Sequence, residues 1–227
     1  AASGISWFYA ILPENVRGRY WASDQFVTAV AAVGTLLASS ALFALLPIYP
    51  ALLLQYGIAL VGSTISYFAL RELPDAERPR AISLASVLRD TPRHLFRPSP
   101  FRRYLWIASF YGIISTPIPP FAAYYLKVGP QLGAGQIMLF EVMRYGGVMA
   151  AAWLIRRWID RVGARPFFLL AVALHGVVAA HWWFYLRAGF GGTAGLYLIY
   201  FILGLGAAAW TVANLNYLPK VIDPAER

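Results

Sequence analysis

Residues 51–70 read ALLLQYGIALVGSTISYFAL, twenty consecutive residues without a charged side chain. A helix rises about 1.5 Å per residue, so a stretch of this length covers the roughly 30 Å of a membrane's hydrocarbon core. The stretch is rich in alanine, leucine and glycine and lacks the strict alternation of a transmembrane barrel strand. It therefore predicts a membrane-spanning helix.

The rest of the chain repeats this pattern. Hydrophobic residues make up 59% of the sequence and charged residues only 13%, whereas soluble domains carry about a quarter charged residues. The predicted spans are 25–46, 51–70, 104–126, 135–155, 166–186 and 193–215. We expect an all-α membrane protein with six complete transmembrane helices, without disulfides because cysteine is absent.

The distribution of basic residues predicts the orientation of these spans. The segments 13–24, 71–103, 156–165 and 216–227 hold 16 of the 19 Lys and Arg. Lys and Arg are retained on the cytoplasmic side of short loops, so these four segments are predicted to be cytoplasmic. The net charge of +9 is mostly explained by this topology, which leaves little support for a nucleic-acid partner.

The longest of these segments, 71–103, divides the spans into two before it and four after it. Its middle, SLASVLRDTPRHLF (83–96), places apolar residues at helical spacing among arginines. A short amphipathic helix on the inner membrane surface fits this pattern, and a flexible linker fits it equally. Either reading gives a domain boundary here, between 1–70 and 104–227.

Two short motifs indicate an internal repeat. LPENVRGR (12–19) and LPKVIDPAER (218–227) each follow an apolar run, and six predicted spans lie between them. The chain also opens on an apolar stretch too short to span, as if a helix continued before it, and stops just after a helix exit. A six-helix repeat would imply a twelve-helix parent, the arrangement of many secondary transporters.

The connection LIRRWIDRVGARP (154–166) resembles the loop signature of the major facilitator superfamily, G-x-x-x-D-R-x-G-R-[RK]. The matching residues are Asp160, Arg161, Gly163 and Arg165. The segment with Arg17 and Arg19 after a proline is similar to the superfamily's connection between helices four and five. Arg156 stands where the signature has its first glycine, and Ala164 replaces one basic residue.

The resemblance covers the whole chain and implies a transporter fragment from the end of helix four to just after helix ten, in a bacterial inner membrane. Residues 1–70 would end the first six-helix half and 104–227 would begin the second. The resemblance also implies a gating role for Asp160, Arg161, Gly163, Arg165, Arg17 and Arg19. The span 25–46 lacks the glycine and proline pattern of the superfamily's drug/proton antiporters, which makes that subclass less expected.

Glu141 and Arg144 are the clearest charged residues inside a predicted span, within MLFEVMRYGGVM (138–149). Charges at such depth are costly and usually face a cavity or a partner. In the functional interpretation, Arg144 holds an anionic group of a substrate and Glu141 binds a proton or cation. In the structural alternative, the two form an ion pair that only stabilises helix packing.

The span 104–126 contains STPIPPFAAYY (115–125), in which Pro117, Pro119 and Pro120 remove backbone donors. We expect a broken or kinked helix that acts as a flexible outer gate beside Tyr111. The alternative is that the helix ends near Ser115 and the prolines form a loop.

His175 and Gln136 are further candidates for substrate contact. His175 has apolar neighbours, however, and a lone histidine is more often a packing residue. The three histidines are scattered, and no carboxylate cluster accompanies them, so we expect no metal and no cofactor.

Taken together, these features predict secondary active transport of a small solute by alternating access, with the lipid bilayer as surroundings. A non-transporting membrane scaffold on the same fold is the alternative. An enzyme is disfavoured because the sequence offers one intramembrane carboxylate and no cysteine.

Overall fold

The computed structural model describes residues 12–71, 96, 98–189 and 191–221. All the regular structure within these ranges is helical. The elements are a 3₁₀ turn, η1 (Glu14–Val16), and the helices α2 (Arg17–Leu45), α3 (Ile48–Arg71), α5 (Pro100–Ser115), α6 (Ile118–Val128), α7 (Ala134–Ile155), α8 (Ile159–Val162), α9 (Arg165–Ala188) and α10 (Gly192–Val221).

Five segments are long and apolar enough to cross a membrane. They are α2, α3, α7 together with α8, α9 and α10. The expectation of a helical, multi-pass membrane protein is confirmed at this level. The count of six is not confirmed, because the predicted span 104–126 is divided into α5 and α6, of 16 and 11 residues.

The break between α5 and α6 follows from the prolines. Thr116 still donates its backbone N–H to Gly112, but Pro117, Pro119 and Pro120 have no N–H to donate. Pro119 and Pro120 lie in the first turn of α6, where the missing donors would be unpaired in any helix. The first helix ends at Ser115, as the alternative prediction had it, but the prolines start a second helix and do not form a loop.

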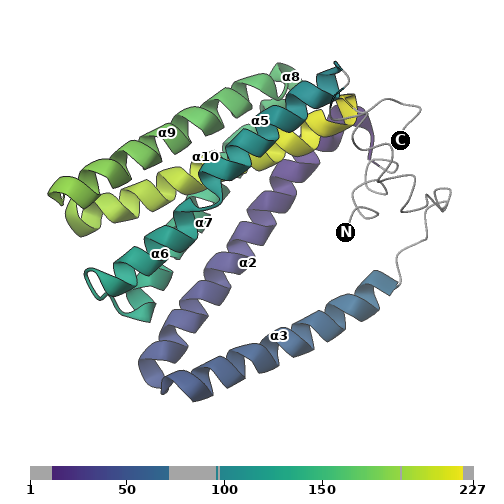
Figure 1. The fold of residues 1–227 in the computed structure, drawn as a ribbon. Helices are drawn as coiled ribbons and strands as arrows, with labels where there is room; N and C mark the ends of the chain where they lie inside the picture. The colour runs from purple at the N-terminus through teal and green to yellow at the C-terminus, as the bar shows by residue number, and fades with distance from the viewer. Residues whose placement is uncertain (1–11, 72–95, 97, 190, 222–227) are drawn as a thin grey trace.

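The bundle is built around α7 and α10. α2 lies along α7, α9 lies along α10, and α2 also contacts α10. Figure 1 shows α9 and α10 side by side, α2 running at an angle to them from one end of α10, and α3 standing apart from the other helices. In α3 only Ala51 is buried, whereas α10 buries twelve residues.

The contact between α7 and α10 depends on two glycines. A Cβ at Gly147 would meet the backbone of Phe201, and a Cβ at Gly204 would meet the backbone of Arg144. Small residues of this kind let membrane helices approach until their backbones touch. Gly146, one residue earlier, has only the ring of Phe201 near it, at 3.9 Å.

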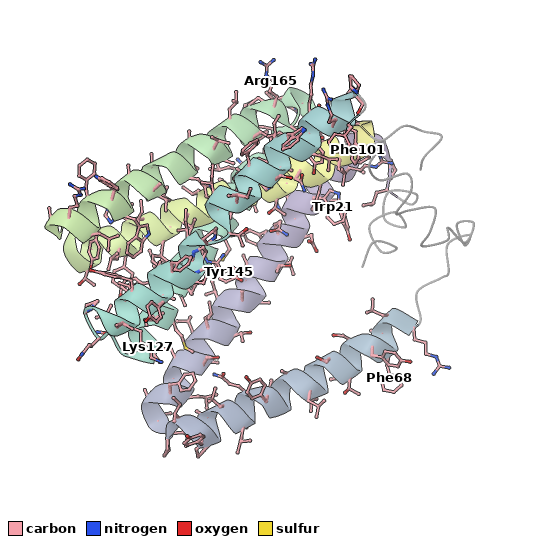
Figure 2. All side chains as sticks on the ribbon, viewed as in Figure 1. Trp21, Phe68, Phe101, Lys127, Tyr145 and Arg165 are labelled. Carbon is pink, nitrogen blue, oxygen red and sulfur yellow. The ribbon has the colours of Figure 1, made fainter. Side chains whose placement is uncertain are left out.

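Three of the four basic segments meet at one end of the bundle. The start of α2, helix α8 and the last turn of α10 lie there, together with the start of α5 (Figure 1). The end of α6, which carries Lys127, lies toward the other end (Figure 2). The arrangement expected from the positive residues is thus present in the fold.

Candidate functional site

Asp160 of the loop motif caps the first turn of α2. Its Oδ1 accepts a hydrogen bond from the backbone N–H of Gly18 (3.0 Å), and its Oδ2 accepts one from Arg19 (3.1 Å). The first N–H groups of a helix have no partner within the helix, and they carry a partial positive charge that favours a carboxylate. A residue 142 positions away therefore supplies the cap that Val16, at the cap position, does not.

This cap also explains where α2 begins. We expected the span to start at residue 25, but the helix starts at Arg17. The first two turns carry the charged residues Arg17, Arg19 and Asp24. Because of these charges, the predicted apolar span did not include the two turns. A capped helix end at the membrane surface tolerates these charges, so the helix is longer than its apolar part.

Gly18 allows the cap to form. A Cβ at this position would lie 2.5 Å from Asp160 Oδ1, 2.6 Å from Ile159 Cγ2 and 2.7 Å from Asn216 Nδ2. The start of α2, helix α8 and the end of α10 therefore meet at one glycine. Asn216 is itself buried and accepts a hydrogen bond from Lys220 at 3.2 Å.

The other motif residues surround this junction. Gly163 has a φ of +82°, which glycine adopts without strain, and it ends α8. Arg161 and Arg165 are exposed on either side of it. Arg17 donates from Nε to the carbonyl of Leu12 at 2.9 Å. The sequence motif thus forms a tight turn that places Asp160 against α2.

Glu141 and Arg144 form an ion pair in the middle part of α7. Arg144 Nε donates to Glu141 Oε2 at 2.6 Å, and the side chains are 21% and 24% exposed. The Arg144 guanidinium also lies 4.3 Å from the centroid of the Tyr145 ring. Each charged group thus has a partner, yet neither side chain is fully buried.

Tyr200 of α10 is a polar neighbour of this pair that sequence reasoning missed. It interacts electrostatically with both Glu141 and Arg144. The residue is 1% exposed, and its hydroxyl has no hydrogen-bond partner in the described part of the chain. The only sequence signal was a tyrosine within an apolar span, and such residues are frequent here.

Tyr111 and His175 come together as a second polar cluster. His175 Nδ1 lies 2.9 Å from the carbonyl of Ala171 and must donate to it, since a carbonyl only accepts. Nε2 is then the acceptor for the Tyr111 hydroxyl, at 3.2 Å. The Tyr111 ring stacks on Trp210 with centroids 3.6 Å apart. Both nitrogens of His175 have partners, as expected of a packing histidine.

This cluster joins three helices. Tyr111 belongs to α5, His175 to α9 and Trp210 to α10. Near it, Tyr104 hydrogen-bonds Asn214 and so ties α5 to α10 a second time. Trp210 was not among the predicted site residues, because an aromatic residue in an apolar helix carries no specific signal.

The remaining predictions fall in three places. Gln136 accepts a hydrogen bond from Gly133 N–H at 3.4 Å, at the start of α7. Pro117, Pro119 and Pro120 form the start of α6, as described above. The predicted amphipathic helix lies outside the described residues, apart from Phe96. In the ranges that the structure describes, no group of three His, Asp or Glu side chains could hold a metal ion.

The chain matches no protein-family model, no curated protein and no solved structure.

Proposed function

We propose that the protein is a secondary active transporter of a small solute, works by alternating access and has the fold of the major facilitator superfamily. The chain would then run from the end of helix four to just after helix ten, with α5 and α6 together crossing the membrane. The support comes from the loop motif, from the charge distribution and from the polar groups inside α7 and α10.

The observation that carries the proposal is the Glu141–Arg144 pair next to Tyr200. A charged pair in the middle of an apolar helix is costly and usually serves a polar pathway. A pair that only stabilised packing would leave no unpaired polar group beside it. Here the buried Tyr200 hydroxyl, a neighbour of the pair, lacks a partner among the described residues.

In the proposed cycle, Arg144 binds an anionic group of the solute. The guanidinium can hold a carboxylate in bidentate geometry, and a solute that takes up the Nε donor would displace Glu141 from it. Glu141, once released from Arg144, binds a proton or a cation. Transport of the solute is thereby coupled to transport of that ion. Tyr200 donates its hydroxyl to the bound solute. Tyr111, His175 and Gln136 remain candidates for substrate contact in this proposal, and each has a hydrogen-bond partner within the chain.

Asp160 and α2 supply the moving contact in this proposal. α2 belongs to the predicted first half and α8 to the second, and two hydrogen bonds join them at the end predicted to be cytoplasmic. Beside the cap, Trp21 of α2 shares a buried core with Ile155 and Ile159, so opening this end would separate that core as well as the cap. The cap would close this end of the transporter in one state and release it in the other.

Uptake of a panel of radiolabelled anionic and zwitterionic solutes into proteoliposomes tests the proposal with the full-length protein. Arg144→Ala and Glu141→Gln should each reduce uptake at least tenfold. Tyr200→Phe should reduce uptake while leaving thermal stability unchanged, since removing an unpartnered buried hydroxyl costs no hydrogen bond. Arg187→Ala, in the last turn of α9, is the matched control and should transport normally.

Two results would count against this proposal in different ways. Normal uptake by both charge variants would reject the site and leave transport standing. No uptake of any solute by the wild type would instead favour the alternative, a membrane scaffold in which the 2.6 Å ion pair stabilises packing.

A further inference from the structure

A second polar feature lies at the end of the bundle marked by Arg165 in Figure 2. A groove of about 640 Å³ runs between the first two turns of α2 and the connection from α7 to α8. Its lining residues are Arg19, Ser23, Arg156, Arg157, Trp158, Asp160 and Arg161. Four of these seven are arginines, contributed by two segments more than 130 positions apart.

The positive charge of the groove exceeds the negative charge that the described residues place in its lining. Asp160 is the one acidic residue in the lining, and both its oxygens accept hydrogen bonds from α2. Within the part of the chain that the structure describes, none of the four arginines forms an ion pair, and all four are exposed. Even with Asp160 counted, the groove carries an excess of three positive charges.

Two tryptophans place this charge at a membrane surface. Trp158 and Trp153 are 55% and 40% exposed, and the Arg157 guanidinium lies 4.0 Å from the centroid of the Trp153 ring. Tryptophan side chains gather where the hydrocarbon core meets the headgroups. The groove lies at the ends of α7 and α2, two helices long enough to cross the membrane. In a membrane spanned by these two helices, its arginines would lie at the height of the lipid phosphates.

We propose that this groove binds the phosphate headgroup of an anionic phospholipid. The planar guanidinium matches a phosphate in bidentate geometry, and clusters of Arg beside a membrane helix attract anionic lipids. Arg19 would hold the headgroup from α2, and Arg156, Arg157 and Arg161 from the other wall. The bound headgroup would bridge the same two segments that the Asp160 cap joins.

The test uses the full-length protein in a neutral detergent, with bound lipids counted by native mass spectrometry. Phosphatidylglycerol is compared with phosphatidylcholine of the same acyl chains, and phosphatidylglycerol should bind at least tenfold more tightly. Each arginine near an anionic surface contributes roughly fivefold, so Arg156→Gln with Arg157→Gln should weaken phosphatidylglycerol binding about 25-fold. Raising the salt concentration should weaken it further.

Matched variants separate this site from general attraction to the membrane. Arg187 lies 4.6 Å from the Trp183 ring, so Arg187→Gln removes the same kind of stacked arginine outside the groove and should leave binding within twofold. Arg156→Lys with Arg157→Lys keeps the charge but loses the bidentate geometry. Its binding should lie between the wild type and the double glutamine variant, which also shows that the site folds.

Three results would overturn the proposal. Equal binding of the two lipids would show that the headgroup is not recognised. Unchanged binding in the double glutamine variant would place the lipid elsewhere. Displacement of phosphatidylglycerol by millimolar inorganic phosphate would show a site for a soluble anion instead. All three are independent of whether the protein transports a solute.

Discussion

Gly18 lies at the point where α2, α8 and α10 meet, and its missing side chain is what brings them together. Gly18→Ala would push a methyl group against Asp160 and Ile159, at 2.5 and 2.6 Å. Overpacking of this kind costs about 1–3 kcal/mol. We expect a lower unfolding temperature in detergent for this variant.

Gly34 provides the control on the same helix. A Cβ there has no atom within 4 Å, and alanine is a better helix former than glycine. Gly34→Ala should therefore leave the unfolding temperature unchanged or raise it. Equal destabilisation by both variants would contradict the three-helix junction.

Asp160 stabilises the start of α2 through its two hydrogen bonds. Asp160→Ala should cost about 0.5–2 kcal/mol of unfolding free energy, the range for loss of a helix cap. Asp160→Asn keeps one acceptor oxygen and should lie between alanine and the wild type. Chemical unfolding followed by circular dichroism measures the difference.

Asp24 is the control for this prediction, because it is an exposed carboxylate two turns into the same helix. Asp24→Ala should change stability by less than about 0.5 kcal/mol, as most surface substitutions do. If it costs as much as Asp160→Ala, the effect comes from net charge and not from capping.

At the scale of elements, the crossing of α7 and α10 is the tightest contact in the bundle. Gly147→Ala and Gly204→Ala each place a Cβ into the backbone of the opposite helix. Backbone cannot move aside as a flexible side chain can, so each should cost about 3 kcal/mol or more. Gly146→Ala meets only the Phe201 ring at 3.9 Å and should be tolerated.

The unfolding temperatures of the three glycine variants, measured in one assay, test this prediction. Positions 146 and 147 are adjacent in the sequence and differ only in which face of α7 they occupy. Similar stability of Gly146→Ala and Gly147→Ala would show that the helices are not in backbone contact there.

The helices themselves were largely predictable from the sequence, because length and apolar composition act locally. The spans of α3, α7 and α9 begin and end within three residues of the expectation. α2 starts earlier because its cap comes from Asp160, far along the chain. The predicted span 104–126 is divided because three prolines remove donors from one turn.

The candidate site was less predictable, because contacts between helices decide it. Glu141 and Arg144 stand out in the sequence since charge is rare in a span. Tyr200 and Trp210 do not stand out, since aromatic residues make up 16% of the chain. Their importance depends on which face of α10 meets α7 or α5. Because α10 is apolar on all sides, its sequence does not indicate which face that is.

At the scale of the molecule, the two ends of the bundle should lie on opposite sides of the membrane. The chain contains no cysteine, so single cysteines can be introduced without background. Val162 in α8 and Val128 at the end of α6 are 50% and 55% exposed. In inside-out vesicles, a membrane-impermeant maleimide should label Val162→Cys and not Val128→Cys.

Right-side-out vesicles supply the converse measurement and should reverse the pattern. Labelling of both positions from the same side would contradict the orientation predicted from the basic residues. It would also remove the membrane-surface position on which the lipid groove depends.

The junction at Gly18 has a consequence for how the protein is made. The start of α2 is synthesised 142 residues before Asp160, and Asn216 follows later still. At about 5–20 residues per second, α2 waits roughly 7–28 s in the membrane before its cap exists. Until then water must satisfy the first turn, so the nascent helix keeps this end at the membrane surface. Assembly of this end is therefore among the late events of biogenesis, and a ribosome arrested before residue 160 would hold α2 uncapped.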